Sequence, residues 1–73
     1  MSHRLKIIDH KGHTELNWDP KSAEEIEVVR ERFDSLMRRS FVAFDLSNSP
    51  GEVIHEFRPH STALLITPKF VGG

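Results

Sequence analysis

The chain contains no cysteine among its 73 residues. Disulfide bonds, thiolate metal sites and cysteine nucleophiles are therefore excluded. A role as a thioester-forming conjugating enzyme is excluded for the same reason. If this protein takes part in acyl or thiol chemistry, it is the group that is carried and not the catalyst.

Long apolar runs and a charge excess are also lacking. The longest apolar runs, such as residues 63–66, fall far short of the ~20 residues that span a bilayer, and residues 1–5 do not begin a secretory signal. Ten Lys and Arg against eleven Asp and Glu give a net charge of -1, which does not favour nucleic acid or anionic lipid. We therefore expect a cytoplasmic protein that binds neither nucleic acid nor membrane and is monomeric when free.

What is present fits one small globular domain. Apolar residues make up 37% of the chain and charged residues 29%. A chain of this length buries roughly 60% of the surface that its unfolded form exposes, so the core is small.

The first third of the chain alternates as a β-hairpin does. Residues 4–9 and 14–18 are strand-like, and a turn that contains Gly12 separates them. In this register Leu5 and Ile7 share the buried face with Leu16 and Trp18, and Ile8 points outward. We expect Trp18 to close the edge of the core; a ligand-stacking role is the alternative.

The next segment carries the signals of an amphipathic helix over residues 20–39. Asp19-Pro20 and the Ser22 to Glu25 spacing are typical of a helix start, and Arg38 and Arg39 suit its end. Apolar residues recur at three- and four-residue intervals: Ala23, Ile26, Val29, Phe33 and Leu36.

After the helix the pattern returns to strands. Residues 41–46 and 52–57 form a second predicted hairpin around a turn at 47–51, with Val42 facing the core and Phe41 facing outward. Residues 63–67 form a last strand, which Pro68 ends. His55 is expected to be partly buried in its strand.

This order predicts an α+β fold of two layers, in which one helix covers one face of a sheet. If the first and last strands are neighbours, both run through the centre of the sheet. The domain is expected to cover residues 1–67, followed by a flexible tail at 68–73. A ferredoxin-like fold is the alternative, and it requires a second helix that the pattern does not show.

The chain ends in Pro68-Lys69-Phe70-Val71-Gly72-Gly73, after the apolar strand that contains Leu64-Leu65-Ile66. With the order of elements above, this ending resembles the ubiquitin-like β-grasp superfamily, in particular its prokaryotic MoaD-like and ThiS-like sulfur carriers. The resemblance implies a non-enzymatic protein whose Gly73 carboxylate, next to Gly72, is adenylated by an E1-like enzyme with ATP. A thiocarboxylate or an isopeptide bond to a target protein then follows. Whether Gly73 is encoded as the last residue or exposed by processing stays open.

The departures from the sulfur carriers lie at Lys69, at Val71 and in the hairpin at 41–57. The alternative function is therefore a non-covalent ubiquitin-like interaction or assembly module, and a regulator of nucleic acid machinery is a third. For a carrier and for an interaction module alike, outward apolar residues on the sheet predict a partner surface at Ile8, Phe41 and Leu65, with Phe70 beside the terminal glycines.

Other candidate sites are weaker. His10 and His13 flank a tight turn, but zinc needs three or four converging ligands, so we expect no metal site. The helical acids alternate with Arg and fit solvated pairs better than acid-base catalysts. No catalytic residue and no cofactor are expected.

Overall fold

The first hairpin forms as its alternation predicts. The computed structural model describes residues 3–47 and 51–69. In it β1 (His3–Asp9) and β2 (Gly12–Trp18) pair antiparallel, and Gly12 has a φ of 120°, which favours glycine. Leu5 lies opposite Leu16 on the buried face.

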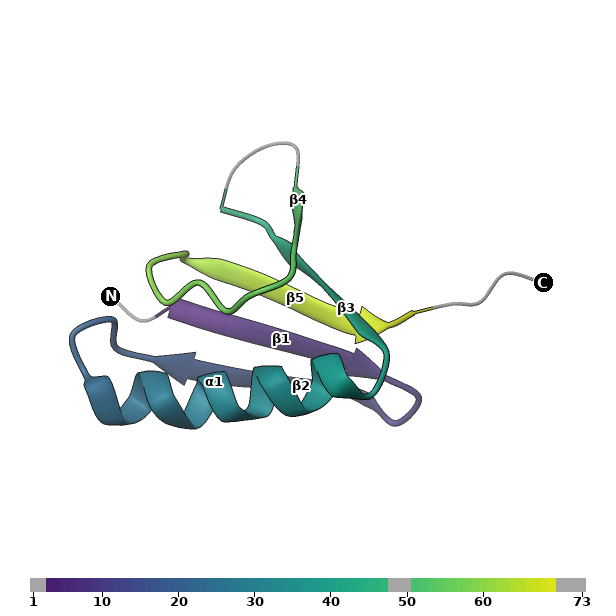
Figure 1. Ribbon diagram of the computed structural model, residues 1–73, viewed down its shortest axis with the longest axis horizontal. Coiled ribbons are helices and arrows are strands. Elements are labelled where there is room, and N and C mark those ends of the chain that lie inside the picture. The colour runs from purple at the N-terminus through teal and green to yellow at the C-terminus, as the bar shows by residue number, and fades with distance from the viewer. Residues whose placement is uncertain (1–2, 48–50, 70–73) are drawn as a thin grey trace.

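The remaining elements complete an α+β fold with a single described helix against a five-stranded mixed sheet (Figure 1). They are α1 (Ala23–Arg38), β3 (Phe41–Asp45), β4 (Glu52–Ile54) and β5 (Ala63–Pro68). The strand order is β2-β1-β5-β3-β4, and β1 runs parallel to β5. The expected pairing of the first and last strands is confirmed.

The helix begins three residues later than predicted, at Ala23. Asp19 Oδ1 accepts a hydrogen bond from the Lys21 amide at 2.8 Å, which fixes a turn there. Ser22 is the cap: its Oγ accepts from the Glu25 amide at 3.2 Å, and Glu25 Oε1 accepts from the Asp19 amide at 2.9 Å. The capping signal of Ser22 and Glu25 is confirmed.

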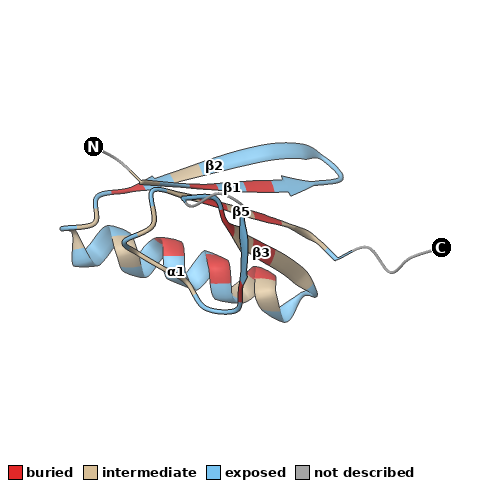
Figure 2. Cartoon of the chain, turned by 90° about the horizontal axis from the view of Figure 1, so that it is seen from above, coloured by how far each residue is buried: buried red, intermediate tan, exposed pale blue. Residues whose placement is uncertain are grey.

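The core lies between α1 and one face of the sheet (Figure 2). The helix contributes Val29, Phe33 and Leu36 to it, as its spacing predicts, while Ile26 packs at its margin. The other members of the core are Leu5, Ile7, Trp18, Ala43, Ile54, Leu64 and Ile66.

The two faces of β3 are the reverse of the prediction. Ala43 is fully buried opposite Ile66, so residues 41, 43 and 45 face the helix, and Phe41 packs against the core. Val42 and Phe44 lie on the other face of the sheet and are half-buried. Both faces of this strand carry apolar side chains, so alternation alone could not indicate which one meets the helix.

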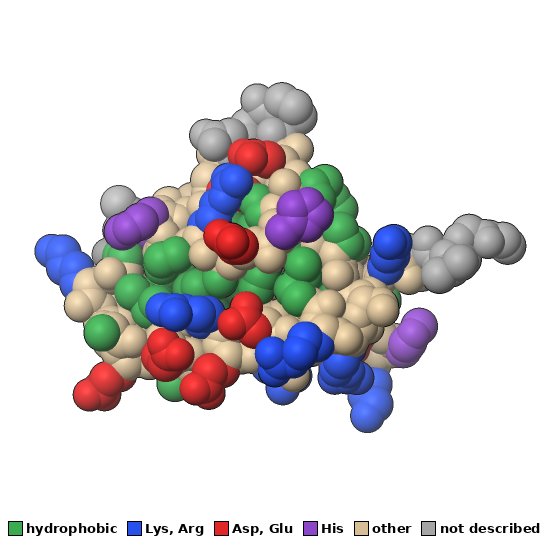
Figure 3. Space-filling view, viewed as in Figure 1, with side chains coloured by type: hydrophobic (Ala, Val, Ile, Leu, Met, Phe, Trp, Pro, Cys, Tyr) green, Lys and Arg blue, Asp and Glu red, His purple; other side chains and the backbone are tan. Residues whose placement is uncertain are grey.

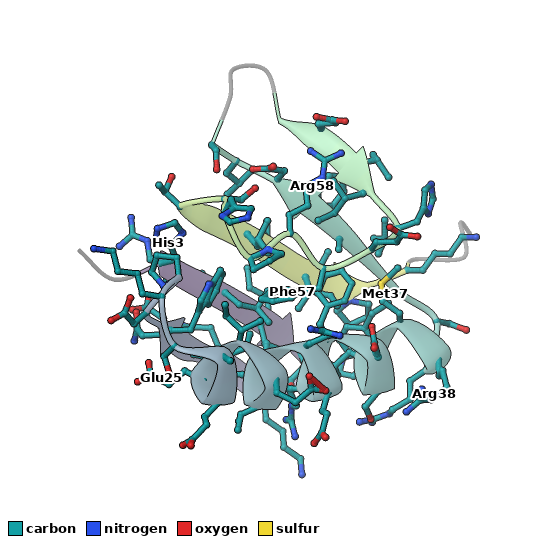
Figure 4. The ribbon with its side chains drawn as sticks, turned by 60° about the vertical axis from the view of Figure 1, so that its left-hand side comes forward. His3, Glu25, Met37, Arg38, Phe57 and Arg58 are labelled. Atoms are coloured by element: carbon teal, nitrogen blue, oxygen red, sulfur yellow. The ribbon has the colours of Figure 1, made fainter. Side chains whose placement is uncertain are left out.

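The second hairpin is shorter than predicted, because β4 ends at Ile54. Phe57 leaves the sheet and packs, partly buried, against the core, with its ring 5.1 Å from that of Trp18 and 5.7 Å from that of Phe33 (Figure 4). Trp18 Nε1 donates to the carbonyl of Pro59 at 2.9 Å. The expected burial of His55 is wrong, since it is exposed.

Candidate functional site

The predicted chemical site follows the end of β5. Gly72, Gly73 and Phe70 lie outside the described residues. Pro68, predicted as the first residue of the tail, still pairs with Phe41 in the sheet, and the Lys69 amide donates to the Ser40 carbonyl at 3.0 Å. The domain therefore holds the chain two residues further than predicted, up to residue 69.

A hollow of about 550 Å³ opens where β5 ends. Its apolar lining consists of Leu36, Phe41 and Pro68, of which Leu36 is buried. Its cationic lining consists of Lys11, Arg32, Arg39 and Lys69. We call this region the basic hollow; the sequence did not indicate it, because its members are far apart along the chain.

The face of the sheet away from α1 carries apolar side chains. Leu65 is half-buried between Lys6 and Phe44 in neighbouring strands, and Phe44 pairs with Val53, which is 50% exposed. Ile8 is 40% exposed on the same face. We call Ile8, Val42, Phe44, Val53 and Leu65 the outer-face patch.

The outer-face patch agrees in part with the partner surface predicted from the sequence. Ile8 and Leu65 lie on this face as expected, and no described element covers it (Figure 2). Phe41 does not belong to it: its side chain is on the helix-facing side and packs against the core. Val42 and Phe44 take its place, because β3 is turned over relative to the prediction.

A buried carboxylate joins β3 to the segment that returns from β4. Asp45 is 3% exposed, and its Oδ2 accepts from Ser61 Oγ at 2.6 Å and from Arg58 at 3.2 Å. Its Oδ1 accepts from the Ser47 amide at 2.9 Å. Arg58 also forms two hydrogen bonds to Glu52, at 3.0 and 2.9 Å, beside β3 and β4 (Figure 4).

These contacts set the charge of the network. Burial raises the pKa of Asp45, but the hydrogen bonds from Ser61, Ser47 and Arg58 outweigh burial and lower the pKa to about 2. The hydrogen bonds and charge of Arg58 lower the pKa of Glu52, and both carboxylates raise the pKa of Arg58. Asp45 is thus ionised at neutral pH and accepts hydrogen bonds on both carboxylate oxygens, so it ties the returning segment to β3 and is not suited to exchange protons near pH 7. In the sequence, the one sign of this network was an acidic residue, Asp45, near the end of the strand predicted over residues 41–46.

Two further features bear on the predictions from the sequence. In residues 3–47 and 51–69, no three His, Asp or Glu side chains gather as a metal site would require. His10 and His13 are both exposed at the first hairpin. Within the same residues, no helix combines the length and apolar character needed to cross a bilayer.

We compared the chain with protein-family models, curated proteins and solved structures, and none of the three comparisons finds a match. The functional proposal therefore rests on the terminal Gly72-Gly73 of the sequence together with the geometry of the domain. The three relevant features are the central position of β5, the basic hollow at its end and the outer-face patch.

Proposed function

We propose that this protein is a ubiquitin-like β-grasp carrier or modifier whose Gly73 carboxylate is the reacting group. The observation that carries the proposal is the position of β5: it runs parallel to β1 in the middle of the sheet, and the five residues 69–73, which end in Gly72-Gly73, follow it directly. A single described helix on one face of this sheet gives the two-layer arrangement that the β-grasp assignment requires.

The proposed chemistry requires that this chain supply a carboxylate that can enter another protein's active site. In the proposed reaction the Gly73 carboxylate attacks the α-phosphorus of ATP, pyrophosphate leaves, and an acyl-adenylate forms. A sulfur donor or a target amine then displaces AMP and gives a thiocarboxylate or an isopeptide bond. The four residues beyond Lys69, when extended, would reach up to about 14 Å, and glycine without a Cβ can pass through a narrow channel.

The outer-face patch supplies a docking surface for the activating enzyme. Its half-buried members, Phe44 and Leu65, are held rigidly in the central strands, so binding costs little side-chain entropy. Apolar side chains that cluster on an uncovered sheet face are typical of protein-binding surfaces.

The test is activation of the purified full chain by the E1-like adenylating enzymes of its source organism, with ATP. Intact mass should show adenylate or thiocarboxylate on the wild-type chain, and deletion of Gly73 should abolish it with the thermal unfolding temperature unchanged. Gly73→Ala is the matched variant, because it keeps a terminal carboxylate and tests how narrow the channel is. An adduct of unchanged yield on the chain that lacks Gly73 would refute the proposal.

A non-covalent interaction module is the second candidate, and the outer-face patch is the observation that favours it, since that surface does not depend on the tail. A deletion strain separates the two functions. If a chain without Gly72-Gly73 complements the deletion strain, the interaction module is supported. If only the full chain complements it, the carrier is supported.

A further inference from the structure

The basic hollow brings together cations from three parts of the chain. Lys11 comes from the first hairpin, Arg32 and Arg39 come from α1 and its end, and Lys69 follows β5. In the described part of the chain, none of these four side chains lies within ion-pair distance of a carboxylate. Asp9 also lines the hollow, but its Oδ1 accepts from the Lys11 amide at 2.9 Å.

The charges of the molecule are segregated, although its net charge is only -1. Lys and Arg side chains gather at the end of the molecule where β5 finishes, and Asp and Glu side chains gather near the other end of α1 (Figure 3). Glu24 and Glu25 lie in the first turn of α1 and Arg38 in its last turn. The hollow thus presents a local positive potential that the net charge conceals.

The hollow also has an apolar floor. Leu36 is 3% exposed, Phe41 and Pro68 are half-buried, and the Arg39 guanidinium lies 5.9 Å from the centre of the Phe41 ring. An anion alone would leave this floor in contact with water. An apolar side chain flanked by carboxylates would cover the floor and pair with the cations around it.

We propose that the basic hollow binds an acidic segment of the activating protein, with one apolar side chain seated between its carboxylates. The inference rests on the proposed function in one respect: Pro68 and Lys69 line the hollow, so any protein that takes up the four residues beyond them must face it. The rim of that protein's entrance is therefore acidic. This contact steers the tail toward the entrance and fixes its direction.

The first experiment measures binding and needs no enzyme. The full chain, labelled with nitrogen-15, is titrated with a capped five-residue peptide in which leucine stands between two pairs of acidic residues. Amide shifts should move around Lys11, Arg39 and Lys69 and not on the outer-face patch. Binding should weaken as salt rises from low ionic strength.

Charge reversal tests the residues. Lys11→Glu and Lys69→Glu should each weaken peptide binding by at least about threefold, and together by about tenfold. Lys21→Glu is the matched control: it makes the same charge change before the start of α1, about 14 Å of helix away from Arg32, the nearest helical residue of the hollow, and should leave binding unchanged. Thermal melts of all the variants verify that they are folded.

Two results would overturn the inference. One is that the peptide binds the double variant as tightly as the wild-type chain, or that a peptide with amides in place of its carboxylates binds as tightly as the acidic peptide. The other is displacement of the peptide by inorganic phosphate at equal concentration, since the site would then select phosphate. The chain without Gly73 should lose activation but keep peptide binding. Failure of the proposed function and failure of this inference are therefore distinguishable.

Discussion

At the scale of the residue, Asp45 makes stability depend on acid pH. Its pKa is lowered from 3.8 to about 2 in the folded protein, so the unfolded chain binds more protons between these values. The stabilisation is complete above about pH 5 and is lost as pH falls through 3.8 toward 2. The expected loss is about 2 kcal/mol of unfolding free energy, measured by urea denaturation at pH 5, 3.5 and 2.5.

Asp45→Asn should remove this part of the pH dependence and lower stability at pH 7 by roughly 1–3 kcal/mol, because the charged acceptor of Ser61 and Arg58 is lost. Glu52→Gln is the control, since Glu52 binds the same Arg58 at an exposed position. A larger effect from Glu52→Gln than from Asp45→Asn would contradict the assignment of the buried carboxylate as the anchor.

At the scale of the element, Phe33 is the fully buried aromatic side chain by which α1 packs on the sheet. Its ring packs against that of Phe57, which lies outside the helix. Phe33→Ala should lower the unfolding free energy by roughly 3–5 kcal/mol. Val28→Ala, on the exposed face of the same helix, should change it by less than about 0.5 kcal/mol. A shift of only a degree or two in the Phe33→Ala melt would contradict this role.

A second test compares Phe41 of β3 with Leu65 of β5, because these two side chains lie on opposite faces of the sheet. Phe41→Ser should lower the melting temperature, since Phe41 packs against the core, whereas Leu65→Ser on the outer face should mainly weaken docking and activation. Both effects are read from melts and from the KM for the chain in the activation assay. A Leu65→Ser chain with unchanged KM would show that the outer-face patch does not meet the enzyme.

The elements also show what sequence can predict. The first hairpin and the stripe of α1 were predicted because one of their faces is polar, so the apolar period fixes the buried side. The buried face of β3 was not predicted correctly, because Val42 and Phe44 on its outer face are apolar and the buried Asp45 is polar. Residues 55–57 were predicted as strand, but β4 ends at Ile54 and Phe57 packs on Trp18 instead of extending it.

At the scale of the whole molecule, the candidate site divides in the same way. Gly72 and Gly73 could be proposed from the sequence, because a terminal motif is local, and their role stays a prediction. The basic hollow was not, since Lys11, Arg39 and Lys69 meet only when β1 and β5 lie side by side. A site assembled from distant segments leaves no periodic signal in the chain.

The parallel pairing of β1 with β5 also constrains how the protein folds. The middle strand, β5, is the last of the five described strands along the chain, and its neighbour β1 is the first, so the core under α1 is complete only when both are present. The core can therefore close only after residues 63–68 are available to pair with both β1 and β3. Pairing between strands so far apart along the chain raises the contact order, so we expect this domain to fold more slowly than a helical domain of the same size.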